Sequence, residues 1–139
     1  MKDIEANPDK PWNYDHGVAQ NPNLTIEFIN ANPEKHWQWY YISQNPGITM
    51  EDIGANLDKP WNYRHGVSQN PNLTMEFVAA NIERNWDWGY VSKNPGITIE
   101  DIQKNTEPQY RWSRNAIYTN PNIISLNIIS LNMMHKYKG

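Results

Sequence analysis

The feature that most constrains this chain is a helix-stopping dipeptide that recurs about every 25 residues. Asn-Pro pairs begin at Asn21, Asn45, Asn70, Asn94 and Asn120, in steps of 24, 25, 24 and 26 residues. The residue before a proline is pushed out of the helical region, so we expect no helix to run through these points. Aromatic pairs keep the same period, at Trp12/Tyr14, Trp37/Trp39, Trp61/Tyr63, Trp86/Trp88 and Tyr110/Trp112. The chain is therefore an array of repeats, in which each unit buries its faces against its neighbours.

A longer period shows that the units are of two alternating kinds. Residues 1–49 and 50–98 are identical at 34 of 49 positions. Odd units contain Pro-Trp-Asn-Tyr-x-His-Gly-Val and end in Asn-Pro-Asn-Leu-Thr, whereas even units contain Trp-x-Trp-x-Tyr and end in Asn-Pro-Gly-Ile-Thr. We place the extra residue of the odd units near His16-Gly17 and His65-Gly66. One domain over 1–139 is predicted, with units at about 1–25, 26–49, 50–74, 75–98 and 99–124.

Each unit is predicted to hold two short helices, which makes the fold all-α, an α-solenoid of tandem helix-turn-helix repeats. The first helix follows a threonine that can cap its free amides, and a glutamate in its first turn complements the helix dipole. These threonines are Thr25, Thr49, Thr74 and Thr98. Each cap has an aliphatic residue before it and another four residues after it, the spacing of a hydrophobic staple. Asn7, Asn32, Asn56, Asn81 and Asn105 are expected to end these helices in the left-handed conformation.

The second helix is expected to begin near Pro11 or Pro60, where a first-turn proline is acceptable. It would carry both aromatic residues and one aliphatic residue, which is Val18, Ile42, Val67, Val91 or Ile117. A β fold is disfavoured because no segment alternates apolar and polar residues for long enough. The fifth unit departs from the pattern, since Ile124 replaces the threonine and Tyr110 replaces the first tryptophan. Residues from about Ser125 to Lys136 are predicted to form a terminal capping helix, whose apolar character permits a homo-oligomer contact.

Composition excludes several classes of function. The net charge is −3 and no Lys/Arg run stands out, which argues against a nucleic-acid partner held by its phosphates. The chain has no cysteine, so disulfides, thiol nucleophiles and thiolate metal sites are excluded. No signal-like segment or run of 18 apolar residues is present, so we predict an intracellular protein that is neither secreted nor bound to a membrane.

The large rings allow two interpretations, because such rings stack on ligands when exposed and fill the core when buried. Two residues two positions apart on a helix point about 200° apart, so both rings of a pair cannot share one exposed face. We therefore expect the rings to pack within and between units, and leave open a ladder of partly exposed second rings as interface anchors. The asparagines are expected to cap, to form turns, or to bridge to the next unit as a ladder.

No catalytic, metal-binding or cofactor-binding residue is predicted. His16 and His65 occupy equivalent places two units apart, on the order of 20 Å at about 10 Å per packed helix layer, which is too far to share a metal. Neither has a second ligand at metal-binding spacing. First-turn carboxylates such as Glu51-Asp52 are explained by capping. No phosphate loop, nucleophile motif or metal motif is present, so the sequence predicts a protein that is not an enzyme.

The segments Glu-Asp-Ile-Gly-Ala-Asn-Leu-Asp-Lys-Pro-Trp-Asn-Tyr and Val-Ser-Lys-Asn-Pro-Gly-Ile-Thr-Ile-Glu-Asp-Ile are similar to a family of repeats. These are the short Trp/Asn-Pro repeats in proteins of amoeba-infecting giant viruses of the mimivirus type. The resemblance covers about residues 1–124 and fails at 124–139. It implies a viral protein in the host cytoplasm or the virion, and it brings no activity and no functional residue.

The leading hypothesis is a non-enzymatic scaffold that binds a protein partner of unknown identity. Its binding surface is predicted at second-helix positions that differ between copies while the framework persists. These are Asp15, Gln38, Tyr40, Arg64, Asp87 and Gly89. The first alternative is a structural or virion-associated building block that self-associates through the C-terminal helix. A nucleic-acid or glycan binder that uses exposed rings is the second alternative.

Overall fold

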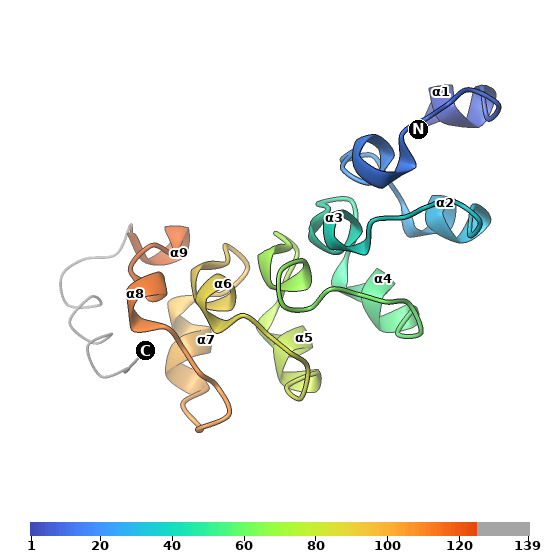
Figure 1. The fold of residues 1–139 in the computed structure, drawn as a ribbon. Coiled ribbons are helices and arrows are strands. Elements are labelled where there is room, and N and C mark those ends of the chain that lie inside the picture. Colours follow the sequence, from blue (N-terminus) through green and yellow to red (C-terminus); the bar gives the residue numbers. More distant parts are fainter. Residues whose placement is uncertain (125–139) are drawn as a thin grey trace.

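The computed structural model describes residues 1–124, and every regular element in this range is a helix. Figure 1 shows the helices stacked in two rows into a long, curved array, with the first and last described units at opposite ends. The predicted all-α fold is confirmed, and the stacked arrangement is compatible with the predicted solenoid of helical repeats. The predicted terminal helix at Ser125–Lys136 lies outside the described residues.

The two rows correspond to the two helices of each unit. The first helices are α1 (Lys2–Ala6), α2 (Ile26–Ala31), α4 (Met50–Ala55), α5 (Met75–Ala80) and α7 (Ile99–Lys104). The second helices are η1 (Tyr14–Val18), α3 (Trp39–Gln44), η2 (Val67–Gln69), α6 (Trp88–Lys93) and α8 (Arg114–Ile117), and α9 (Pro121–Ile124) follows them. Helices this short are not stable alone in water, so contacts between units must hold them.

The predicted N-terminal caps of the first helices are confirmed. Thr25 accepts a hydrogen bond from the amide of Phe28, and Thr74 does the same for the amide of Phe77. Thr49 and Thr98 form full capping boxes, in which an aspartate three residues later returns a bond to the cap amide. The aliphatic residues on either side of these caps are buried.

The asparagines that end the first helices do so in a conformation that the sequence did not predict. Asn7, Asn32, Asn56, Asn81 and Asn105 are the C-caps, as expected, but their φ angles run from −134° to −120°. The prediction of left-handed caps is therefore wrong. Each side chain instead donates from Nδ2 to the carbonyl four residues earlier, as Asn56 does to Asp52 at 2.7 Å. That bond fixes the helix end without a positive φ.

The prediction that the second helix begins at Pro11 or Pro60 is also wrong. These prolines lie in the non-helical connectors, and each second-helix segment begins at or after the second ring of its pair. The amide of Trp12 bonds the Lys10 carbonyl across Pro11, a tight turn that suits the fixed φ of proline. The indole of Trp12 also donates to the Asn7 carbonyl, at 2.7 Å. These two bonds fold the connector into turns, and the same pair recurs at Trp37, Trp61 and Trp86.

The ring pairs consequently do not share a helix, and they form a ladder along the array. The second ring of one unit meets the first ring of the next edge to face. The pairs are Tyr14–Trp37, Trp39–Trp61, Tyr63–Trp86 and Trp88–Trp112, with centroids 5.0 to 5.5 Å apart. Phe28 and Phe77 pack against the same first rings from within their units. The rings therefore belong to the core and its margin, as predicted, although both rings of a pair pack between units.

The extra residue of the odd units lies where the sequence places it. In even units the first turn closes four residues back, as from the Ile42 amide to the Gln38 carbonyl. In the first and third units the corresponding hydrogen bond reaches five residues back. The amide of Val18 donates to the Asn13 carbonyl, and the amide of Val67 donates to the Asn62 carbonyl. The wider turn accommodates the extra residue. The aliphatic residue of each second-helix segment therefore stays buried at an equivalent position.

The asparagines of the Asn-Pro pairs form a buried ladder between units. Asn45, Asn70, Asn94 and Asn120 are at most 3% exposed, and each Nδ2 donates to backbone carbonyls of the preceding unit. Their Oδ1 atoms accept from the amide two residues later. These side chains confirm the predicted ladder and satisfy backbone groups that would otherwise be buried without partners.

The residue after each Asn-Pro pair distinguishes the two unit types. A Cβ on Gly96 would lie 1.8 Å from the Leu73 carbonyl oxygen, and one on Gly47 would lie 2.3 Å from that of Leu24. Asn72 instead reaches back from the corresponding place to the carbonyls of Pro46 and Ile48, at 2.9 Å each. Interfaces with a close backbone contact at glycine therefore alternate with interfaces bridged by an asparagine side chain. This alternation accounts for the difference between the two unit types at this position.

The fifth unit is aligned differently from the prediction. Trp112, and not Tyr110, takes the place of the first ring, because its indole donates to the Asn105 carbonyl and its ring meets Trp88. Two additional residues lengthen this connector, and Tyr110 stacks on Trp112 at an interplanar angle of 12°. Asn120 keeps its place in the ladder, so the insertion is confined to the connector.

Candidate functional site

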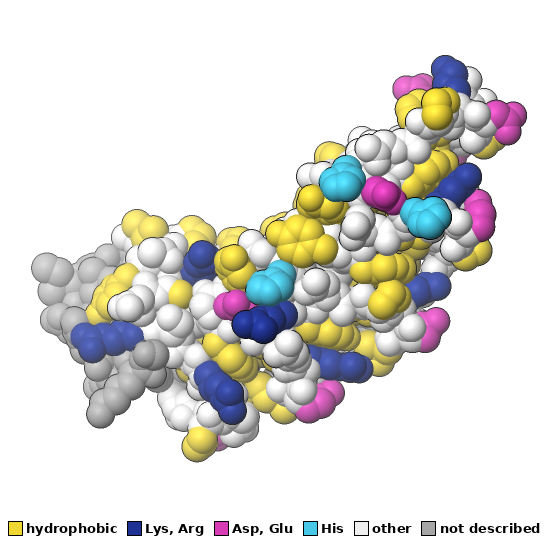
Figure 2. Space-filling model, viewed as in Figure 1, with side chains coloured by type: hydrophobic (Ala, Val, Ile, Leu, Met, Phe, Trp, Pro, Cys, Tyr) yellow, Lys and Arg dark blue, Asp and Glu magenta, His cyan; other side chains and the backbone are white. Residues whose placement is uncertain are grey.

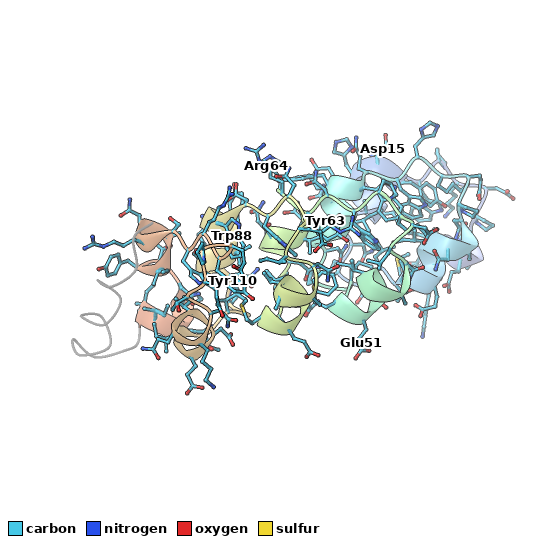
Figure 3. The ribbon with its side chains drawn as sticks, turned by 90° about the horizontal axis from the view of Figure 1, so that it is seen from below. Asp15, Glu51, Tyr63, Arg64, Trp88 and Tyr110 are labelled. Atoms are coloured by element: carbon cyan, nitrogen blue, oxygen red, sulfur yellow. The ribbon has the colours of Figure 1, made fainter. Side chains whose placement is uncertain are left out.

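One side of the array is formed by the non-helical connectors and the first turns that follow them. In Figure 1 these connectors, residues 7–13, 32–38, 56–62, 81–87 and 105–113, run across the nearer side of the molecule. We call this side the connector face. Figure 3 places Asp15 and Arg64 along one edge of the array and Glu51 on the opposite edge. The connector face and the row of first helices are thus separate surfaces.

Each connector ends in a residue that caps the next turn. Asn13, Asn62, Asp87 and Ser113 each accept a hydrogen bond from the amide three residues later. Gln38 occupies the same position without such a bond. From the third unit onward, the amide of this cap residue also donates to a serine of the preceding unit, as Asp87 does to Ser68 at 3.1 Å. Capping bonds therefore fix equivalent backbone positions in four of the five units.

The residue two positions after each cap differs in every unit. We call these residues the variable column: Asp15, Tyr40, Arg64, Gly89 and Asn115. Tyr40, Arg64 and Asn115 are exposed, and Asp15 and Gly89 are half-buried. Along one line, the connector face thus presents an acid, an aromatic ring, a base, a residue without a side chain and an amide.

In the first four units, the residue three positions after the cap forms a second line beside the first. This aromatic column consists of His16, Tyr41, His65 and Tyr90, and Ala116 takes the place in the fifth unit. His16 contacts Tyr41 with centroids 5.3 Å apart, and His65 lies 6.5 Å from Tyr90. Figure 2, in the same orientation as Figure 1, shows histidine side chains on the connector face with charged groups of both signs near them. Flat rings therefore border the variable column.

Of the six residues predicted to bind a partner, the structure brings four into the variable column. Asp15, Tyr40, Arg64 and Gly89 share this line, whereas Gln38 and Asp87 sit at the cap position. Asp87 is part of the framework, since its carboxylate accepts from the Tyr90 amide at 3.0 Å. Asn115 belongs to the column but was not predicted, because the insertion in the fifth connector hid its alignment.

A hollow of about 360 Å³ opens on the connector face between the first two connectors. Asp15 lines it together with Lys10, Glu34, Lys35 and His36. The ammonium of Lys35 lies 4.9 Å from the centre of the Tyr14 ring, which also borders the hollow. At the equivalent place two units later, the Arg84 guanidinium lies over Tyr63 at 5.0 Å. Both copies thus place a cation over the tyrosine ring, whereas Asp15 of the first copy is replaced by Arg64 in the second.

Tyr63 has an unusual environment within this frame. Its hydroxyl oxygen is buried and has no hydrogen-bond partner. Burial raises the pKa of Tyr63, while the nearby charge of Arg84 lowers this pKa and that of Glu83 raises it. The Tyr63 ring packs edge to face against Trp86. Tyr63 therefore stabilises the contact between units through its ring, while its hydroxyl remains a buried polar group without a partner.

The row of first helices is predominantly acidic. It carries Asp3, Glu5, Glu27, Glu51, Asp52, Glu76, Glu100 and Asp101, against Lys2 and Lys104. Asp52 and Asp101 complete capping boxes, and first-turn acids complement the helix dipole. These carboxylates therefore have structural explanations, in agreement with the prediction from sequence.

Within residues 1–124, no group of three or more His, Asp or Glu side chains is placed to hold a metal ion. None of the described helices is long and apolar enough to cross a bilayer.

No family model, curated protein or solved structure matches the chain. The function of this chain is therefore inferred from its own geometry.

Proposed function

We propose that this protein is a non-enzymatic repeat scaffold that binds another protein through the variable column of its connector face. The observation that carries the proposal is the contrast between two sets of positions. The threonine caps of the first helices, the ring ladder and the asparagine ladder repeat almost unchanged, whereas the variable column holds five different residues. Packing dictates the first set, so differences in the second set can serve recognition.

The aromatic column supports the same surface. Tyrosine and histidine rings offer large contact areas with few rotatable bonds, and tyrosine is enriched at protein interfaces. Tyr40 is 37% exposed and packs against Tyr41 at a centroid distance of 5.0 Å. This pair would provide an anchor beside the charged positions Asp15 and Arg64.

Site-specific photocrosslinking tests the surface. A photoreactive phenylalanine analogue would replace Tyr40 on the connector face or, as the matched control, Glu51 on the opposite edge. We expect the variant at position 40 to crosslink a partner in host-cell extract and the variant at position 51 not to do so. Equal crosslinking from both positions would contradict the proposal, and a crosslinked pair of identical chains would favour the self-associating alternative.

A further inference from the structure

We call the side of a unit that receives the preceding unit its leading face, and one motif covers this face at the third, fourth and fifth units. The motif is Ile/Val-Ser-x-Asn, at residues 42–45, 67–70 and 91–94. Its serine and asparagine carbonyls accept from the asparagine ladder, as those of Ser43 and Asn45 do from Asn70. Its serine hydroxyl accepts from the cap amide of the next unit, as Ser43 does from Asn62 at 2.9 Å.

The leading face of the first unit carries the same donors without such a cover. Asn21 and Asn23 occupy the places of Asn70 and Asn72, whose Nδ2 atoms donate to carbonyls of the preceding unit. Among residues 1–124, the Nδ2 atoms of Asn21 and Asn23 donate no hydrogen bond, although the Oδ1 of Asn21 accepts from the Asn23 amide. Two side-chain donors of the ladder are therefore unused at this end of the array.

The same face is hollowed and leaves a large ring without a partner. A hollow of about 520 Å³ opens there, lined by Met1, Lys2, Asp3 and Asn23. Within the described residues Trp12 has no ring partner and is half-buried, whereas its counterpart Trp61 is buried against Trp39 of the preceding unit. The leading face of the first unit thus has room and bonding groups for an Ile/Val-Ser-x-Asn segment.

The chain has this motif again beyond the described residues, as Ile129-Ser130-Leu131-Asn132. We propose that this segment of one copy docks on the leading face of the first unit of a second copy. Figure 1 places the first and last described units at opposite ends of the array, so the partner is a second copy. An earlier occurrence of the motif, residues 124–127, begins within α9 and is therefore closer to the last unit along the chain.

The proposed contact repeats the chemistry of the interfaces inside the array. Asn21 donates from Nδ2 to the carbonyls of Ser130 and Asn132, Ile129 is buried, and the Ser130 hydroxyl accepts from the Asn13 amide. The two sides of this contact are different surfaces, so copies join head to tail in open chains. The contact lies away from the connector face and does not depend on the proposed function.

Single cysteines can report this contact, because the chain has none of its own. At the third unit, Asn72 donates to the carbonyl of Pro46, the residue that follows the motif. The equivalent pair is Asn23 of one copy and Met133 of the other. Full-length Asn23→Cys and Met133→Cys chains, mixed under oxidising conditions, should form a mixed disulfide-linked dimer.

The control replaces Asn23→Cys by Glu51→Cys, which lies in α4 and outside the leading face of the first unit. We expect no dimer between Glu51→Cys and Met133→Cys chains. A dimer that forms equally with the control, or one that joins two Asn23→Cys chains in preference to the mixed pair, would overturn the inference.

A second test removes the donor without removing the acceptor. Asn21→Asp keeps the oxygen that accepts from the Asn23 amide and loses Nδ2. Analytical ultracentrifugation of the full chain should show reversible association, and this substitution should weaken it about tenfold. Asn85→Asp adds the same charge at an exposed position of a connector and should leave association unchanged. A chain that stays monomeric at all concentrations, or equal effects of both substitutions, would contradict the proposed contact.

The docking segment is tested by the same measurement. Ile129→Asp should weaken association to a similar extent, because the first residue of the motif is fully buried at Ile42 and Val91. Ile124→Asp makes the same change in the earlier occurrence of the motif, at a side chain that is exposed, and should have little effect. A stronger effect at position 124 than at position 129 would overturn the assignment of the segment.

Discussion

At Asn70, one side chain satisfies four backbone groups of a buried interface. Its Nδ2 donates to the carbonyls of Ser43, Asn45 and Ile48 at 3.0, 3.2 and 3.1 Å, and its Oδ1 accepts from the Asn72 amide at 2.8 Å. An amide is the side chain that offers both donors and an acceptor in this space. These hydrogen bonds explain why asparagine recurs at this position in every unit.

Asn70→Asp should be more destabilising than Asn70→Ala near neutral pH. The alanine leaves buried carbonyls without a donor, at a cost of about 1–3 kcal/mol. The aspartate adds a buried negative charge facing those carbonyl oxygens. Urea denaturation would measure the free energy of unfolding, with the exposed Asn85→Asp as control. A smaller loss for Asn70→Asp than for Asn70→Ala would contradict the assigned hydrogen bonds.

Tyr63→Phe should increase stability, because it removes a buried hydroxyl without a partner. The expected gain is on the order of 1 kcal/mol. Tyr14→Phe is the matched control, at the equivalent position of the first unit. Urea denaturation at pH 7 would compare the two variants, and a loss of stability in Tyr63→Phe would show that its hydroxyl has a partner.

The raised pKa of Tyr63 also predicts a dependence on pH. The folded chain holds this phenolic proton more tightly than the unfolded chain, where the reference pKa is 10.0. The stabilisation is fully present below pH 10 and is lost as the pH rises toward the folded pKa. Thermal unfolding between pH 9 and 11 should therefore show a smaller loss for Tyr63→Phe than for the unchanged chain. Parallel curves would argue against the raised pKa.

At the scale of elements, the turns after the Asn-Pro pairs set how closely neighbouring units approach. Gly47 and Gly96 permit contact with the preceding backbone, and Asn72 and Asn122 bridge the alternate interfaces. None of the described residues has a positive φ. Glycine is needed at these two turns for space, and not for backbone conformation.

Gly96→Ala and Gly54→Ala should change stability in opposite directions. The new Cβ at position 96 would force the backbone of Leu73 away, so we expect a loss of about 1–3 kcal/mol from overpacking. At position 54, within α4, a Cβ would meet nothing within 4 Å, and alanine should stabilise by about 0.5–1 kcal/mol. Guanidinium denaturation of both variants tests this. Equal effects would mean that the close contact is absent in solution.

At the scale of the whole molecule, stability comes from contacts between neighbouring units. Trp61 and Trp12 make the same indole bond to a helix-ending carbonyl, each at 2.7 Å. Trp61 also packs against Trp39 of the preceding unit with centroids 5.0 Å apart, whereas Trp12 lies in the first unit. The pair therefore isolates the contribution of the interface between units.

Trp61→Ala should consequently destabilise the array more than Trp12→Ala. Removal of a buried tryptophan costs about 3–5 kcal/mol, and we expect a smaller loss for the half-buried Trp12. Hydrogen exchange followed by mass spectrometry would show where each array opens. If the two substitutions were equally destabilising, the contacts between units would not dominate the stability.

Features that depend on nearest neighbours along the chain could be predicted from the residues alone. The threonine caps, the stops before Asn-Pro and the widened turns at His16-Gly17 and His65-Gly66 follow from local sterics and hydrogen bonding. For the same reason the period, the helical class and four of the five residues of the variable column could be predicted from the sequence.

Other features could be seen only in the folded array, because they depend on which partner a side chain meets there. The indole bonds of the tryptophans accompany non-helical connectors where Pro11 and Pro60 had predicted helix. Trp112 takes its place through Asn105 and Trp88, which revealed Asn115 as part of the variable column. Asp87 lies at the cap position, where its carboxylate accepts a hydrogen bond from the Tyr90 amide. In each case the side chain has several possible partners, and the packing of the array determines which of them it contacts.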